Sequence, residues 1–164
     1  RNYYRSAVTQ FVKTNFNDLS TFIGIAGNDG EPGRSGFQEA YFSIMSRAKI
    51  VVTCNPDRWE GDYRLFEALS SGSLVMSDKM KTPMMNPFIH NKHLIYYDKT
   101  NLDTLADQIR RLLIDEEKRL EIANNGYRHA MSFHTTEKRI DEILAHVELS
   151  KKIKLMTQRS RISD

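Results

Sequence analysis

The chain has 164 residues, of which 40% are hydrophobic and 27% charged, so it is long enough for one domain with a substantial core. Its net charge of +3 is too small to indicate nucleic-acid binding, although it suits an anionic small ligand such as a diphosphate. Cys54 is the only cysteine, which excludes an intrachain disulfide and a cysteine-rich zinc site, and the apolar runs are too short to span a membrane.

The amino-terminal segment predicts a helix, a strand and a loop in that order. Apolar residues at helical spacing predict a helix over residues 3–14. The apolar run Thr21–Ala26 predicts a strand, and the glycine-rich segment Gly27–Gly33 predicts the loop after it. The chain starts at Arg1 rather than at methionine, so we expect a piece cut from a longer polypeptide, or a mature or trimmed product. It shows no signal peptide, and we expect a cytoplasmic location.

A second helix and strand follow. Ser35 and Gln38 form a capping box for a helix. The apolar face of this helix is expected to comprise Phe37, Tyr41, Ile44 and Ala48. The β-branched run Lys49–Cys54 predicts a strand, which Asn55-Pro56 ends.

The middle of the chain repeats this alternation. Asp62 is placed to cap a helix that ends at Gly72. Two further strands, Leu74–Ser77 and Leu94–Tyr97, are separated by a loop over residues 78–93.

The remainder of the chain predicts helices. Asn101 is expected to cap the first of them, and Gly126 to end the second. A third helix, capped by Thr135 or Thr136, has an apolar face of Ile140, Ile143, Leu144 and Val147. The basic segment 150–164 loses this periodicity, so we predict a tail or linker after a domain formed by residues 1–149.

The strands predict the fold class. They are continuous apolar runs without polar alternation, so both faces of the sheet must be covered. The fold class is therefore α/β, a Rossmann-like parallel sheet with helices on both faces and a helical C-terminus. Because ligands bind at the carboxyl ends of such strands, we expect a site formed by the loops that begin at Gly27, Asn55 and Asp78.

The loop that begins at Asn55 carries the most informative residues. At the helix start, the backbone amides of Gly61, Asp62 and Tyr63 suit a phosphate, because a helix N-terminus carries unpaired N–H groups and a partial positive charge. Arg64 is able to bind a phosphate oxygen, and Glu67, on the same helical face, is able to accept two ribose hydroxyls. The alternative is that Arg64 and Glu67 form a surface ion pair.

The segment Glu60–Val75 (EGDYRLFEALSSGSLV) resembles the signature helix of group 1 glycosyltransferases, and most closely the branch of spore-maturation-like proteins. The resemblance extends over residues 37–54, 93–97, 102–113 and 115–144. It implies one half of a GT-B architecture, in which two Rossmann-like domains face each other across a cleft. The C-terminal domain holds the nucleotide sugar, and the N-terminal domain holds the acceptor.

This resemblance implies the roles of the site residues. Arg64 and Glu67 would be the catalytic residues, with Glu67 on the ribose, while Gly61–Tyr63 and Asn55 complete the donor site. Trp59 stands where many retaining members carry a further glutamate. The donor would be a UDP- or GDP-sugar, with no cofactor or metal, and the partner an N-terminal GT-B domain of the same polypeptide. We therefore expect a hexosyltransferase-like enzyme that is inactive as this isolated chain.

Two other functions stay open. A glycosyltransferase-like domain without its partner is able to serve as a non-catalytic binding or scaffolding module. A flavodoxin-like receiver is less well supported, because no acidic cluster follows a strand. The histidines lack the spacing of a metal site, so we expect surface or core positions for His90, His93, His129 and His134.

Overall fold

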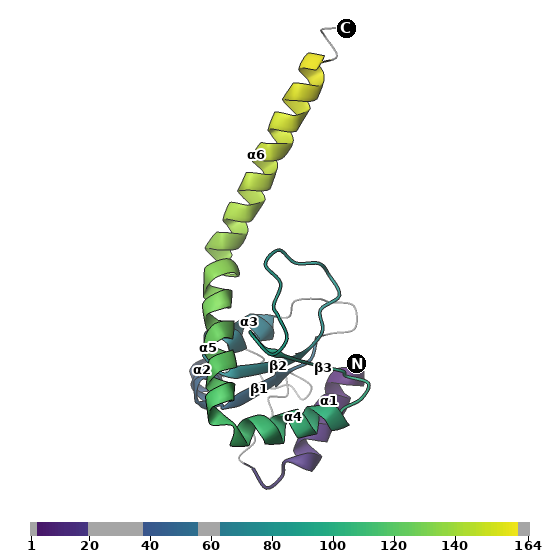
Figure 1. Ribbon diagram of the computed structural model, residues 1–164, viewed down its shortest axis with the longest axis vertical. Coiled ribbons are helices and arrows are strands. Elements are labelled where there is room, and N and C mark those ends of the chain that lie inside the picture. Colours follow the sequence, from purple (N-terminus) through teal and green to yellow (C-terminus); the bar gives the residue numbers. More distant parts are fainter. Residues whose placement is uncertain (1–2, 20–37, 56–62, 161–164) are drawn as a thin grey trace.

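The computed structural model describes residues 3–19, 38–55 and 63–160 (Figure 1). The expected strand Thr21–Ala26, the loop Gly27–Gly33 and the cap Asp62 lie outside these residues. Within them, no helix is long and apolar enough to cross a bilayer.

The described strands form one parallel sheet in the order β1-β2-β3. They are β1 (Ile50–Thr53), β2 (Leu74–Asp78) and β3 (Ile95–Tyr97), so the predicted strands are confirmed to within one residue at each end. All five residues of the central strand β2 are buried, as expected for a strand that is covered on both faces.

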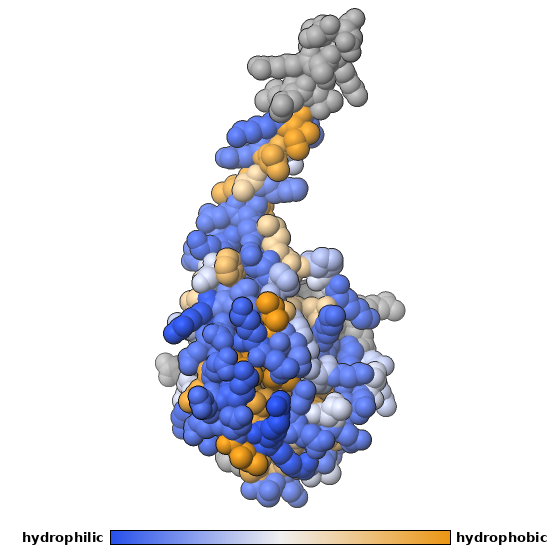
Figure 2. All heavy atoms as spheres, in the orientation of Figure 1, coloured by the Kyte–Doolittle hydropathy of each residue, from blue (hydrophilic) through white to orange (hydrophobic). Residues whose placement is uncertain are grey.

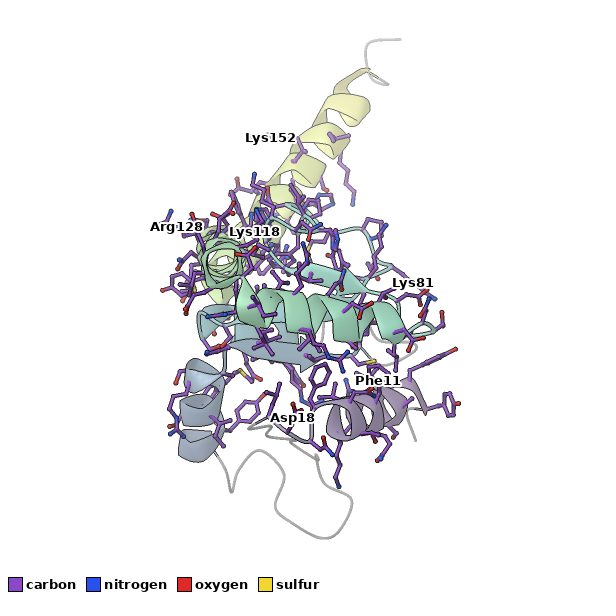
Figure 3. All side chains as sticks on the ribbon, turned by 60° about the horizontal axis from the view of Figure 1, so that its bottom comes forward. Phe11, Asp18, Lys81, Lys118, Arg128 and Lys152 are labelled. Carbon is purple, nitrogen blue, oxygen red and sulfur yellow. The ribbon has the colours of Figure 1, made fainter. Side chains whose placement is uncertain are left out.

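Two groups of helices cover the two faces of the sheet. Leu74 and Met76 of β2 belong to a core cluster that includes residues of α1 (Tyr3–Asn15) and α4 (Asp103–Ile114). Val75, which points to the opposite face, belongs to a second cluster with residues of α2 (Gln38–Arg47) and α3 (Tyr63–Ser70). In Figure 3, α1 and α4 lie near each other, with Phe11 between them. The predicted Rossmann-like α/β fold is confirmed.

The long helix α5 (Glu116–Phe133) joins the two core clusters. Its residues Ile122 and Ala123 pack in the first cluster and Ala130 packs in the second. The helix therefore crosses beside the sheet, and it contacts α3, α4 and β2 (Figure 1).

The two glycines expected to end helices behave differently. Gly72, two residues after the last residue of α3, has a φ of +79°, which confirms the predicted end of that helix. The prediction for Gly126 was wrong, because α5 continues through this residue to Phe133. A Cβ atom at Gly126 would overlap the backbone carbonyl oxygen of His93, so this glycine allows a close approach between α5 and the loop before β3.

Two local predictions need correction. Asn101 does not cap α4, since the N-cap residue is Leu102 and makes no side-chain capping hydrogen bond. The backbone N–H of Asn101 instead donates to the carbonyl of Asp98 in a turn. Among the α2 side chains whose burial the structure describes, Met45 is buried and packs with Tyr41, four residues earlier, while Ile44 of the expected apolar face is half-buried.

The last helix, α6 (Thr136–Ser160), extends away from the body of the molecule (Figure 1). The hydroxyl of Thr135 accepts from the backbone N–H of Lys138 at 3.4 Å, which is the predicted cap. The expected apolar face is exposed, with Val147 43% and Ile143 62% accessible, and Figure 2 shows apolar side chains along this helix. The backbone stays helical through residue 149, and the domain boundary expected there stays a prediction.

Candidate functional site

Helix α3 begins at the edge of the sheet where the carboxyl ends of the strands lie. It connects the parallel strands β1 and β2, so its first turn must lie at the carboxyl end of β1. Leu65, Ala68 and Leu69 are buried against the sheet and α5. Burial of this face fixes the backbone of α3 and turns its other faces outward.

The outward faces of α3 carry three of the predicted site residues. Tyr63 is exposed, and Arg64 and Glu67 are half-buried. The spacing of Arg64 and Glu67 places them one turn apart on adjacent surface. Gly61 and Asp62, the other predicted residues of the helix start, lie outside the described residues.

The carboxylate of Glu67 is held from the neighbouring helix α2. The hydroxyl of Tyr41 donates to Oε2 of Glu67 at 3.1 Å. The ring of Tyr41 packs against the second core cluster, and this packing holds its hydroxyl in position. The sequence analysis placed Tyr41 only on an apolar face and missed this contact, because it joins residues 26 positions apart.

Asn55, the remaining predicted site residue, lies buried at the carboxyl end of β1. Its backbone N–H donates to Oδ1 of Asp78 at 2.7 Å, and its Nδ2 donates to the carbonyl of Asp78 at 3.4 Å and to Oγ of Ser77 at 3.5 Å. Asn55 thus ties the end of β1 to the end of β2.

Asp78 brings a buried charge to the same edge. Its carboxylate lies 3.4 Å from Nζ of Lys99, with the side chain of Asp78 6% exposed and that of Lys99 20% exposed. Nζ of Lys99 also lies 4.9 Å from the centre of the Tyr4 ring on α1. Sequence reasoning took Asp78 as the start of a loop. A carboxylate directly after a buried strand was the available signal for this pair.

The thiol of Cys54 at this edge is buried. Burial raises its pKa, and the neighbouring Asp78 carboxylate adds to this rise. The backbone carbonyl of Cys54 accepts from Nε of Arg5 at 3.0 Å, which fastens α1 to the edge. Burial also raises the pKa of Tyr97, whose hydroxyl donates to the carbonyl of Thr53 at 2.7 Å. We therefore expect neither side chain to act as a nucleophile near neutral pH.

Three histidines fasten the loop between β2 and β3 to the end of α5. The backbone carbonyl of Asn86 accepts from Nε2 of His129 at 2.9 Å and from Nε2 of His134 at 3.0 Å. The rings of His93 and His129 stack with their centres 4.0 Å apart. The Phe88 ring packs against all three imidazoles.

Two of these imidazoles require a neutral form. Nδ1 of His93 accepts from the backbone N–H of Ile89 at 3.2 Å, and Nδ1 of His134 accepts from the guanidinium of Arg139 at 2.6 Å. Burial lowers the pKa of His93 to about 4, with a contribution from His129. Burial and the Arg139 charge lower the pKa of His134 to about 4. In the described part of the chain, no three His, Cys, Asp or Glu side chains are arranged to hold a metal ion.

A groove of about 500 Å³ lies between this loop and α6. It is lined mostly by apolar side chains, including Met80, Met84, Ile143 and Val147, with Arg139 among its polar ones. Arg64 and Glu67 do not line this groove. Phe66 of α3 packs against Phe88, with ring centres 6.2 Å apart, so the loop is in contact with the helix that carries the predicted site.

Comparisons with known proteins agree with this architecture. A family model described as glycosyl transferase-like matches residues 17–145. A solved structure, the C-terminal domain of a glycosyl transferase group 1 family protein (LpcC) from Francisella tularensis, matches with a TM-score of 0.54 at 20% identity. The match covers 81% of this chain and 63% of that one, and it supports the predicted fold of a GT-B C-terminal domain. No curated protein matches.

Proposed function

Because the chain belongs to the glycosyl transferase-like family, we propose that it binds the nucleoside-diphosphate sugar for a group 1 glycosyltransferase. A second, N-terminal GT-B domain would bring the acceptor, and the reaction would transfer a hexosyl group to it. We place the chain in the spore-maturation-like branch on the sequence of α3. Because the chain spans 63% of the length of the solved domain, activity is proposed for the whole enzyme and not for this part.

The start of α3 supports this proposal most directly. Arg64 and Glu67 are half-buried on a helix that starts at the carboxyl edge of a parallel sheet, where α/β proteins bind their ligands. The amides of Gly61–Tyr63 would contact the diphosphate, Arg64 would bind a phosphate oxygen, and Glu67 would accept from the ribose hydroxyls. Asn55 would support the edge on which the diphosphate lies, because its amide already joins two strand ends.

The contribution to catalysis would be electrostatic. Negative charge grows on the diphosphate as the bond to the sugar breaks, and fixed positive groups stabilise that charge. A helix N-terminus contributes roughly 0.3–1 kcal/mol. A hydrogen bond from Arg64 to a charged oxygen contributes about 1.5–3 kcal/mol. Together these interactions would make the nucleoside diphosphate a better leaving group.

Thermal unfolding with added ligand tests this function. Saturation with UDP, GDP or one of their sugar conjugates should stabilise the chain, by about 2.7 kcal/mol at a ligand concentration 100 times Kd. Glu67→Ala should remove this stabilisation while the unliganded protein still unfolds cooperatively. Glu148→Ala, which removes an exposed carboxylate on α6, is the matched control and should keep the full shift.

The alternative of a scaffolding module makes the opposite prediction. Such a module would show no stabilisation with any nucleoside diphosphate, and Glu67→Ala would then behave like the Glu148→Ala control. This result would remove the support for donor binding.

A further inference from the structure

Tyr41 is held between the core and the predicted donor site. Its ring is half-buried on α2, packs against the second core cluster and meets Phe42 edge to face, with ring centres 5.4 Å apart. The hydroxyl leaves this packed environment and donates to Oε2 of Glu67 at 3.1 Å. The hydroxyl therefore has little freedom to move, although its ring serves mainly as core.

Glu67 is the kind of side chain that gains from such a contact. A glutamate has several rotatable bonds, and a half-buried one on a helix samples several rotamers unless a partner selects one. The backbone of Glu67 is already fixed, because its neighbours Leu65, Ala68 and Leu69 are buried. The hydrogen bond from Tyr41 fixes the other end of the side chain, so the carboxylate is oriented before any ligand arrives.

The chemistry of a carboxylate leaves it able to bind a diol at the same time. The two oxygens of a carboxylate offer about four acceptor positions, so a single bond from a phenol is compatible with bonds from a diol. Two adjacent hydroxyls need two acceptors whose spacing and plane are set in advance. A neutral phenol orients the group without taking away its negative charge.

On this geometry, and resting on the proposed function above, we propose that Tyr41 is a positioning residue that makes the donor site select ribonucleoside over deoxyribonucleoside diphosphates. Tyr41 acts through Glu67 and does not touch the nucleotide. Removing its hydroxyl should therefore weaken the recognition of the ribose hydroxyls and spare the contacts with the diphosphate and the base.

Calorimetric titration of the full chain separates these contributions. UDP and GDP are titrated beside their 2′,3′-dideoxy counterparts into the wild type, Tyr41→Phe and Tyr127→Phe. Tyr41→Phe keeps the ring and removes only the hydroxyl, and Tyr127→Phe makes the same change on an exposed tyrosine of α5. Unfolding curves establish that both variants are folded.

The wild type should prefer the ribonucleotide about ten-fold, the selectivity expected from hydrogen bonds to a charged acceptor. Tyr41→Phe should bind the ribonucleotide roughly three- to ten-fold more weakly and the dideoxynucleotide within two-fold of the wild type. Tyr127→Phe should match the wild type. Adding Glu67→Ala to Tyr41→Phe should cost no more than Glu67→Ala alone, because the two residues act as one unit.

Three outcomes would overturn the proposal. An equal loss of both nucleotides in Tyr41→Phe would mean that the hydroxyl only supports the fold. Unchanged selectivity in Tyr41→Phe, with Glu67-dependent selectivity in the wild type, would refute the role of Tyr41 and leave the donor site intact. No binding of either nucleotide by the wild type would remove the proposed function, and this inference would fall with it.

Discussion

Gly126→Ala places a methyl group where α5 meets the loop before β3. The new Cβ would overlap the carbonyl oxygen of His93 and lie 3.0 Å from Cδ2 of Leu69. The end of Leu69 is able to move aside. The carbonyl is less free, because the loop is fixed where the N–H of His93 donates to the carbonyl of Ile89 at 2.9 Å.

Two opposing contributions set the change in the free energy of unfolding that Gly126→Ala causes. Overpacking that shifts backbone costs roughly 1–3 kcal/mol, and this overlap is with backbone, so we take the upper end. Replacing glycine inside a helix returns up to about 1 kcal/mol. We therefore expect a net loss of about 2 kcal/mol, which lowers Tm by roughly 4–8 °C in a chain of this size.

Urea unfolding followed by circular dichroism measures this loss. Asn124→Ala, at an exposed position of the same helix, is the control and should gain a few tenths of a kcal/mol from helix propensity. If Gly126→Ala were as stable as the wild type, the close approach would not explain this glycine.

Two further predictions concern buried or half-buried titratable groups. The free energy of unfolding should be level above about pH 7.5 and fall as pH drops towards 4, by less than the roughly 1.4 kcal/mol per pH unit of a fully buried group for each of His93 and His134, because solvent partly screens both rings. The sign follows because their lowered pKa values let only the unfolded chain take up protons in this window. Urea titrations from pH 7.5 to 5.5 measure this fall in the free energy of unfolding. A free energy that stays constant over this range would contradict the prediction. Asp78→Asn should cost about 2 kcal/mol, because Lys99 loses its partner at a mostly buried position, while Asp141→Asn, on exposed α6, should cost under 0.5. Equal costs in chemical denaturation would show that the Asp78 pair contributes nothing.

The strands and most helices could be predicted because their signals are local. The run that became β1 is β-branched, the run that became β2 is apolar over its first three residues, and both end at polar residues. Glycines are harder to interpret from sequence, because Gly72 and Gly126 are required for different structural reasons. Gly72 adopts a positive φ, which is a local requirement. Gly126 allows close contact with the backbone of His93, which lies far away in the sequence.

How the predicted site residues lie relative to one another was predictable only within one helix. The spacing of Arg64 and Glu67 places them on neighbouring surface of α3. Tyr41 and the cluster of His93, His129 and His134 escaped prediction, because their partners lie on other elements and no residue spacing records them. The apolar periodicity of α6 correctly predicted a helix, but it did not reveal that this face is exposed.

The donor site at the start of α3 is tested most directly by amide chemical shifts. A titration of the ¹⁵N-labelled chain with UDP and GDP should shift the amides of Tyr63, Arg64 and Glu67 first and most strongly for the nucleotide that binds. The amides of the exposed part of α6, from Ile143 onward, should stay in place. Saturable shifts confined to α6 or to the groove beside it, with α3 unchanged, would contradict the assignment of the donor site.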